Sequence, residues 1–109
     1  MAEQAGSLYP HDPVVHLLLG RAHLAAGRPA EAVEELRRGL MLDPLLASGH
    51  RYLGYALAAI GRFAEAVEQW SQWERLAARS ETELAQQEDV RRAKTAAQTL
   101  AGTGAGFHG

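Results

Sequence analysis

The sequence repeats with a fixed period, which equals the separation between Gly27 and Gly61. This period constrains the fold more than any other feature of the sequence. The segment from Gly27 to Glu34 matches the segment from Gly61 to Glu68 at seven of eight positions. The same offset pairs four further sets of residues: His16 with His50, Leu19 with Leu53, Gly20 with Gly54, and Ala22 with Ala56. A fixed period of this order is typical of helical repeat arrays, in which neighbouring units stack to bury a shared core.

Each repeat is predicted to be a pair of antiparallel helices joined by a short turn. Asp12 is placed to cap the first helix, and Pro13 suits the first helical position, where its missing N–H costs nothing. Gly27 tolerates the positive φ with which helices often end. Pro29 then opens a second helix, which Asp43-Pro44 stops because proline disrupts the preceding turn. In the second unit, the same signals predict helices over 47–60 and 64–79. The expected apolar stripes are Val14, Leu17, Leu18, Ala22 and Ala25, then Val33, Leu36, Leu40 and, as a further candidate, Met41.

The spacing of the repeated residues resembles that of the tetratricopeptide repeat. The matching patterns are His16-x2-Leu19-Gly20-x2-His23, Ala32-x3-Leu36 and Pro44 in the first unit, and His50-x2-Leu53-Gly54-x2-Leu57 and Ala66-x3-Trp70 in the second. The resemblance covers residues 13–80 and implies an all-α superhelix of two antiparallel hairpins, at 13–46 and 47–80. Small residues are expected to let the two helices of each hairpin approach closely: Gly20, Ala32, Gly54 and Ala66.

Several positions depart from the family pattern. His16 and His50 stand in its usual Trp slot, His23 and Leu57 in its Tyr slot, and Ala78 replaces the closing Pro of the second unit. Trp73 is the counterpart of Gly39 one repeat later, in a slot that the family keeps small so that the next helix can dock. We therefore expect Trp73 to push the following helix outward or to change its angle. Two alternatives remain for this side chain. It covers that helix, or it is an exposed interface anchor for a partner or a second copy, because Trp is enriched among binding hot spots.

The two ends of the chain are expected to differ from the repeats. Leu8 and Pro10 lie one repeat before Leu42 and Pro44, so residues 1–12 are interpreted either as the remnant of a preceding repeat or as a simple N-terminal lead-in. Ser80 and Glu83 form a capping box, which predicts a capping helix over 81–101. Its apolar stripe is Val90, Ala93, Ala97 and Leu100, opposite Glu88, Arg91, Arg92 and Gln98. Residues 102–109, rich in glycine, are predicted to be a flexible tail.

Composition argues against several functions. The formal charge of −2 provides no basic field to attract nucleic acid or anionic lipid, and the longest apolar run is too short to span a bilayer. The absence of cysteine excludes disulfides and thiolate metal sites. The sequence has no His-x3-His pair, no phosphate-binding loop and no serine paired with a base, so neither a metal, a cofactor nor an enzymatic activity is expected. The N-terminus lacks the apolar region of a signal peptide, so a cytoplasmic location is expected.

The resemblance implies that the chain binds other proteins. Tetratricopeptide proteins typically bind extended peptides or helices in a groove lined by the first helix of each hairpin. Matching positions place eight residues in such a groove: Val14, Leu17, Arg21, Leu24, Ser48, Arg51, Tyr55 and Ala58. Leu17 and Tyr55 replace members of the Lys/Asn/Arg set with which chaperone-binding relatives clamp a peptide C-terminus. We therefore expect a peptide with an acidic residue between apolar ones, whose carboxylate would pair with Arg21 and Arg51 while Leu17 and Tyr55 supply apolar contact.

A second hypothesis is a structural one, in which the chain associates with itself. Two repeats are fewer than the three or so that such arrays usually need for stability. Stacking of two copies through the N-terminal end would cover an open apolar face, giving a weak homo-oligomer or scaffold with no peptide ligand.

Overall fold

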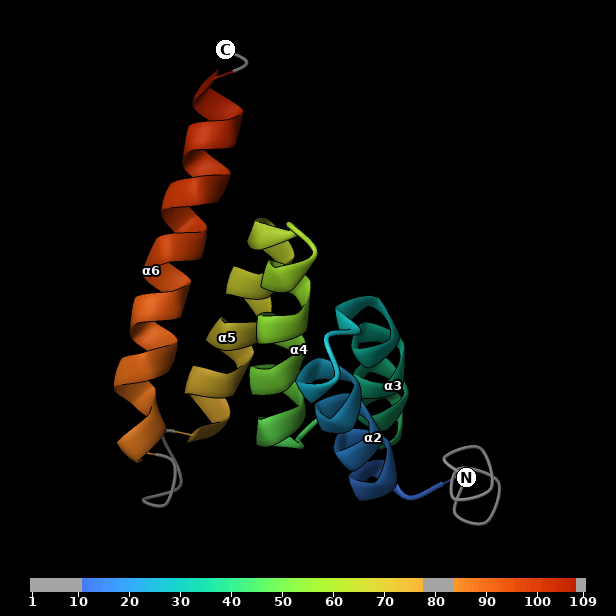
Figure 1. Cartoon of the computed structure of the whole chain (residues 1–109). Helices are drawn as coiled ribbons and strands as arrows, with labels where there is room; N and C mark the ends of the chain where they lie inside the picture. Colours follow the sequence, from blue (N-terminus) through green and yellow to red (C-terminus); the bar gives the residue numbers. More distant parts are fainter. Residues whose placement is uncertain (1–10, 78–83, 108–109) are drawn as a thin grey trace.

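The computed structural model describes residues 11–77 and 84–107, apart from the side chains of 84–86 and 103–107. Within these residues there are five helices and no strands: α2 (Pro13–Ala25), α3 (Pro29–Leu42), α4 (Ala47–Ala59), α5 (Phe63–Ala77) and α6 (Leu84–Phe107). Two helical hairpins, α2–α3 and α4–α5, pack side by side, and α6 lies against α5 (Figure 1). The all-α class and the repeated hairpin are therefore confirmed. Every helix in the described part of the chain is too short or too polar to cross a bilayer.

The ends of the helices follow from local chemistry. The N–H of Val14 donates to Asp12 Oδ1 at 2.9 Å, which satisfies one of the free donors at the start of α2. Gly27 and Gly61 adopt positive φ values of 75° and 82° in the turn of each hairpin, a conformation that other residues rarely adopt. Between the hairpins, the side chain of Asp43 accepts the N–H of Leu45 at 3.1 Å. The two glycines thus form the short turn of each hairpin, while Asp12 and Asp43 stabilise the start of α2 and the connection between the hairpins.

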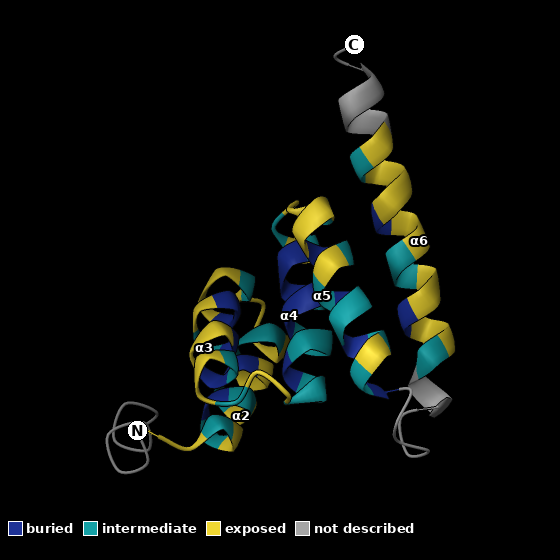
Figure 2. Cartoon of the chain, turned by 180° about the vertical axis from the view of Figure 1, so that it is seen from behind, coloured by how far each residue is buried: buried dark blue, intermediate teal, exposed yellow. Residues whose placement is uncertain are grey.

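Glycine allows close packing inside both hairpins. A Cβ atom at Gly20 would overlap the side chain of Leu36, and one at Gly54 would overlap the indole of Trp70. The core that results is continuous through both hairpins and into α6. Its fully buried members include Ala32, Leu36, Ala56, Leu57, Ala66, Trp70, Trp73 and Val90. Figure 2 shows the buried segments in dark blue on the helix faces that meet, with exposed residues in yellow outside.

The apolar stripe predicted for α2 is wrong in part. Val14 and Leu18 are 48% and 54% exposed, while His16 and Gly20 are the buried residues of this helix. Gly20 is buried because Leu36 occupies the space beside it. His16 can be buried because its Nδ1 has a polar partner, Glu35 Oε2 on α3, at 2.8 Å. In α3, Met41 is exposed rather than part of the stripe.

Of the two alternatives for Trp73, the exposed interface anchor is wrong. Gly39, at the equivalent position, lies against Pro13 and His16 of the first helix of its own hairpin. Trp73 is fully buried and belongs to the core that α6 covers. The structure therefore does not present Trp73 as an exposed interface anchor.

Helix α6 docks on α5 and then continues further than predicted. Val90 and Ala97 are buried, and Lys94 Nζ lies 2.6 Å from Glu74 Oε1 of α5. Leu100, expected on the buried stripe, is half exposed. The helix runs to Phe107 instead of ending at residue 101, because Gly102 does not adopt positive φ and no proline follows it. The predicted flexible tail is thus helical as far as Phe107, and the Ser80–Glu83 capping box lies outside the described residues.

Candidate functional site

An arginine–tyrosine cluster lies at the seam between α2 and α4. The Cζ atom of Arg21, on α2, is 4.9 Å from the centre of the Tyr52 ring on α4. Arg51 lies over the same ring at 4.5 Å, and its Nη2 donates to the Tyr52 hydroxyl at 3.2 Å. A guanidinium group over an aromatic face is attracted by the negative charge density of the ring. One tyrosine therefore brings together two positive charges that come from different repeats.

The cluster is joined to the core through a series of aromatic rings. The ring centroids of Tyr52 and Tyr55 are 6.4 Å apart, and Tyr55 meets Trp70 edge to face at 5.5 Å. Trp70 is buried, and its Nε1 donates to the backbone carbonyl of Arg51 at 3.1 Å. Edge-to-face aromatic pairs are favourable because a positive ring edge meets a negative face. The arginine–tyrosine cluster is thus held by packed side chains.

Among the described residues, the two guanidinium groups of the cluster have no acidic partner. Within the described residues, no carboxylate oxygen lies within 4.0 Å of Arg21 or Arg51. Elsewhere, arginines are paired with glutamates: Arg37 with Glu65 at 3.2 Å, Arg38 with Glu35 at 2.7 Å and Arg92 with Glu88 at 3.1 Å. The Nε atom of Arg51 is also buried with no hydrogen-bond acceptor among the described residues. An arginine fork with free donors is suited to bind a carboxylate.

The eight predicted groove residues do not all lie at the arginine–tyrosine cluster. Arg21, Arg51 and Tyr55 are brought together, but only through Tyr52, which the sequence interpretation did not include. Four of the eight predicted residues are half-buried and pack on the core: Leu17, Leu24, Tyr55 and Ala58. Val14 is exposed and Ser48 half-buried, and in the described part of the chain neither one has a hydrogen bond or ring contact with the cluster. A signal for Tyr52 was present, because Tyr52 is adjacent to Arg51 and lies three residues before Tyr55 on the same helix.

His16 and His50 make polar contacts between the two helices of their hairpins. His16 pairs with Glu35, and one repeat later His50 pairs with Gln69, with 2.8 Å from Nδ1 to the side-chain oxygen in each case. His50 Nε2 also lies 2.8 Å from the carbonyl oxygen of Pro44, which connects α4 to the turn between the repeats. No group of three potential metal-binding side chains occurs in the described part of the chain. We assign these histidines to packing between helices.

Comparison with solved structures places the architecture among helical repeat proteins. The chain superimposes on the type III secretion translocator chaperone SycD of Yersinia enterocolitica with a TM-score of 0.84 and 19% identity, covering 90% of this chain and 68% of SycD. A tetratricopeptide repeat domain protein of Salinibacter ruber gives a TM-score of 0.69 and 23% identity, covering 84% of this chain and 92% of that protein. At these identities the likeness concerns the fold alone.

Family models matched to the sequence show to which family the chain belongs. No curated protein sequence matches this chain. Two models, both described as tetratricopeptide repeat, match residues 1–51 and 47–72. Together they extend over residues 1–72 of 109, which include both hairpins except the end of α5. The chain therefore belongs to the tetratricopeptide repeat family.

Proposed function

We propose that this protein-interaction module binds an extended peptide along the seam of α2 and α4, with an acidic residue of the peptide between Arg21 and Arg51. The family assignment and the chaperone among the structural neighbours support a general role in binding proteins. The tetratricopeptide fold is generally a non-enzymatic interaction fold. The observation that supports this particular site is the pair of guanidinium groups over one tyrosine with no carboxylate beside them among the described residues.

The surroundings of the cluster indicate what kind of peptide fits. Leu17 and Leu24 of α2 and Tyr55 of α4 are half-buried, so each presents part of an apolar side chain next to the charged cluster. An apolar residue on either side of an acidic one could cover this surface. The peptide carboxylate would then form an ion pair with Arg21 and Arg51, of the kind that Arg37, Arg38 and Arg92 form with glutamates of the chain.

A titration with synthetic peptides tests the proposal. The probe is a fluorescent peptide with one Glu between Leu residues, compared with the same peptide carrying Gln. Charged hydrogen bonds contribute about 1.5–3 kcal/mol each, so we expect the Gln peptide to bind at least about tenfold more weakly. The Arg21→Ala/Arg51→Ala double variant should bind both peptides equally weakly.

The matched control removes the same charge from elsewhere on the surface. Arg28 and Arg91 are exposed and lie outside the seam, so the Arg28→Ala/Arg91→Ala variant should retain the preference for Glu over Gln. Equal affinity of the original chain for the two peptides would refute the groove assignment. So would a loss of preference in the control variant, because the effect would then depend on total charge alone.

A further inference from the structure

The first helices of the two hairpins differ in charge from the second helices. The only arginine of α2 is Arg21 and the only one of α4 is Arg51, and neither helix contains a lysine or an acidic residue. The second helices carry the glutamates of the two hairpins: Glu31, Glu34 and Glu35 on α3, and Glu65, Glu68 and Glu74 on α5. The surface that α2 and α4 contribute is therefore positive, although the chain as a whole has a formal charge of −2.

The two positive charges lie on one aromatic ring. The guanidinium carbons of Arg21 and Arg51 are both within 4.9 Å of the centre of the Tyr52 ring, so they are at most twice that distance apart. The ring attracts both cations, but it carries no net charge. A carboxylate placed between the two arginines brings a single negative charge, so one of the two positive charges would remain uncompensated.

Both guanidinium groups also have free hydrogen-bond donors. A guanidinium has five N–H donors in a planar fork. Within the described part of the chain, Arg51 uses Nη2 to donate to the Tyr52 hydroxyl at 3.2 Å, and Arg21 donates to no acceptor. A phosphate monoester offers three strong acceptor oxygens and a charge of about −2, whereas a carboxylate offers two oxygens and one charge. A phosphate can therefore accept hydrogen bonds from both arginines at once.

We propose that the acidic residue received by the seam is a phosphorylated serine or threonine, whose two negative charges are matched by Arg21 and Arg51. The inference rests on the proposed function, because it specifies the acidic residue of the peptide bound there. Leu17 and Leu24 are half-buried and lie about one helical turn before and after Arg21, so they would contact the residues that flank the phosphorylated one. A peptide gains from these apolar contacts, and free phosphate does not.

Other carriers of phosphate fit the seam less well. Polybasic segments that bind anionic lipid have roughly four to eight Lys or Arg residues, and nucleic acid is likewise bound through several phosphate contacts. Helices α2 and α4 provide only Arg21 and Arg51, with leucines beside them. A single phosphorylated residue in an apolar peptide is the better match.

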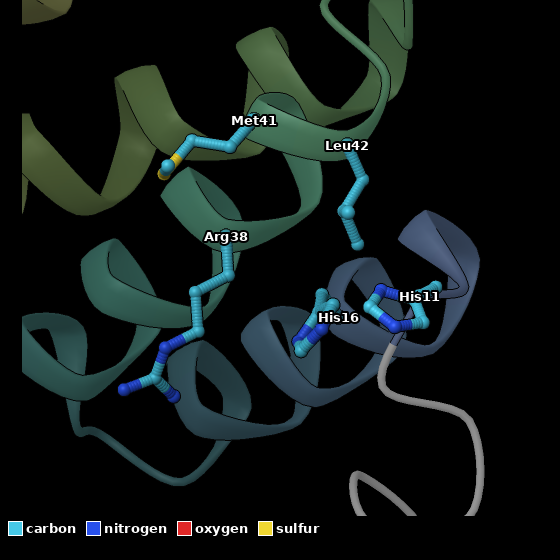
Figure 3. A pocket seen from close by; sticks show the side chains of 5 residues that line it. All are labelled: His11, His16, Arg38, Met41 and Leu42. Atoms are coloured by element: carbon cyan, nitrogen blue, oxygen red, sulfur yellow. The ribbon is translucent and has the colours of Figure 1, made fainter.

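An open pocket in the first hairpin is an alternative place for a phosphate. The pocket has a volume of about 320 Å³ and is lined by His11, His16, Arg38, Met41 and Leu42 (Figure 3). Arg38 already has an acidic partner there, because its Nη1 donates to Glu35 Oε1 at 2.7 Å. A phosphate bound to Arg38 would be repelled by the Glu35 carboxylate. Arg38 therefore serves as a matched control for the two arginines of the seam.

Fluorescent peptides of equal length test the inference on the original chain, at a pH well above the second pKa of a phosphate, about 6. Three of them carry phosphoserine, Glu or Gln between Leu residues, and a fourth carries two adjacent Glu residues. The second arginine should bind the second charge of the phosphate, so we expect the phosphoserine peptide to bind at least about tenfold more tightly than the Glu peptide. It should also bind more tightly than the two-Glu peptide, because adjacent side chains of an extended peptide point to opposite sides.

Single substitutions show whether both arginines are needed. Arg21→Gln or Arg51→Gln leaves one guanidinium, so the advantage of phosphoserine over Glu should fall below about threefold. Arg38→Gln removes the same charge from an arginine that is already paired, and it should retain the full advantage. Arg21 is exposed, so its substitution should leave the fold unchanged, which circular dichroism checks.

Phosphorus NMR of the bound phosphoserine peptide gives a second measurement. Two nearby guanidinium groups favour the dianion over the monoanion, so the second pKa of the phosphate should be lower in the complex than in the free peptide. With Arg21→Gln the signal should titrate at a pH closer to that of the free peptide, whereas Arg38→Gln should cause no change. A phosphate that titrates alike in the free and bound peptide would overturn the inference.

The peptide series separates a failure of this inference from a failure of the proposed function. If the Glu and phosphoserine peptides bind equally, and both more tightly than the Gln peptide, the phosphate inference is overturned and the proposed function stands. If all three bind equally, both are overturned. Equal binding of the two-Glu and phosphoserine peptides would also overturn the phosphate inference. So would displacement of the phosphoserine peptide by an equal concentration of inorganic phosphate, because the seam would then bind a free anion.

Discussion

At the scale of single residues, the contact between Gly54 and Trp70 shows how closely the helices of a hairpin meet. The indole nitrogen of Trp70 lies too close to Gly54 to leave room for a Cβ atom there, and it donates to the carbonyl of Arg51 on the same helix as Gly54. Moving the indole would therefore disturb both the packing of the hairpin and the aromatic series that leads to Tyr52. Gly102, in contrast, has no neighbouring atom within 4 Å of such a Cβ position among the described residues.

Two substitutions to alanine should therefore change stability in opposite directions. Gly54→Ala forces Trp70 from its place, and overpacking of this kind costs about 1–3 kcal/mol. Gly102→Ala meets nothing and replaces the poorer helix former, so it should stabilise by about 0.5–1 kcal/mol. Urea unfolding measures both free energies. A Gly54→Ala variant as stable as the original chain would contradict the packing described for this hairpin.

Some of these residue contacts could be predicted and others could not. The close approach at Gly20 and Gly54 was expected from the repeated pattern of small residues. The role of Tyr52 was not, because it depends on how side chains of α2 and α4 meet across the seam. Position 18, its equivalent in the first repeat, holds a leucine, so the repeat itself gave no sign of a polar cluster.

At the scale of helices, local signals predicted the boundaries of α2 and α3 better than the end of α6. Asp12, Pro13 and Pro29 mark the beginnings of α2 and α3 correctly, because capping and proline geometry act within one turn. The end of α6 was predicted too early, at residue 101 rather than at Phe107. A helix that is already formed gains one hydrogen bond with each added residue, so a glycine weakens it without necessarily ending it.

Helix α6 is expected to be held mainly by its buried face against α5. Val90→Ala removes apolar volume from a fully buried position and should cost about 2 kcal/mol. Leu100→Ala removes more atoms from a half-exposed position and should cost less than about 0.5 kcal/mol. Thermal unfolding of the two variants compares them directly. Equal destabilisation would indicate that α6 is not docked through Val90.

At the scale of the whole molecule, the two ends and the seam are distinct surfaces. The C-terminal end is covered by α6, whose outer side carries Glu88 and Arg91, while Val14 and Leu18 of α2 are exposed in the first hairpin. The sequence predicted the two hairpins and a cap, and it identified an open N-terminal end as a possible stacking surface. The sequence did not show that Val14 and Leu18 of α2 are about half exposed. Helical periodicity predicts the apolar side of a helix, but it does not predict which neighbour covers that side.

The central claim is that the seam between α2 and α4 receives an acidic peptide. The most direct test is an NMR titration of the chain with the Glu-containing peptide, observing the side-chain N–H signals of the arginines. The signals of Arg21 and Arg51 should shift together with the backbone amides around Tyr52, and those of Arg37 on α3 and Arg75 on α5 should not. Shifts confined to α3 and α5, or no shift at Arg21 and Arg51 while the peptide binds, would contradict the claim.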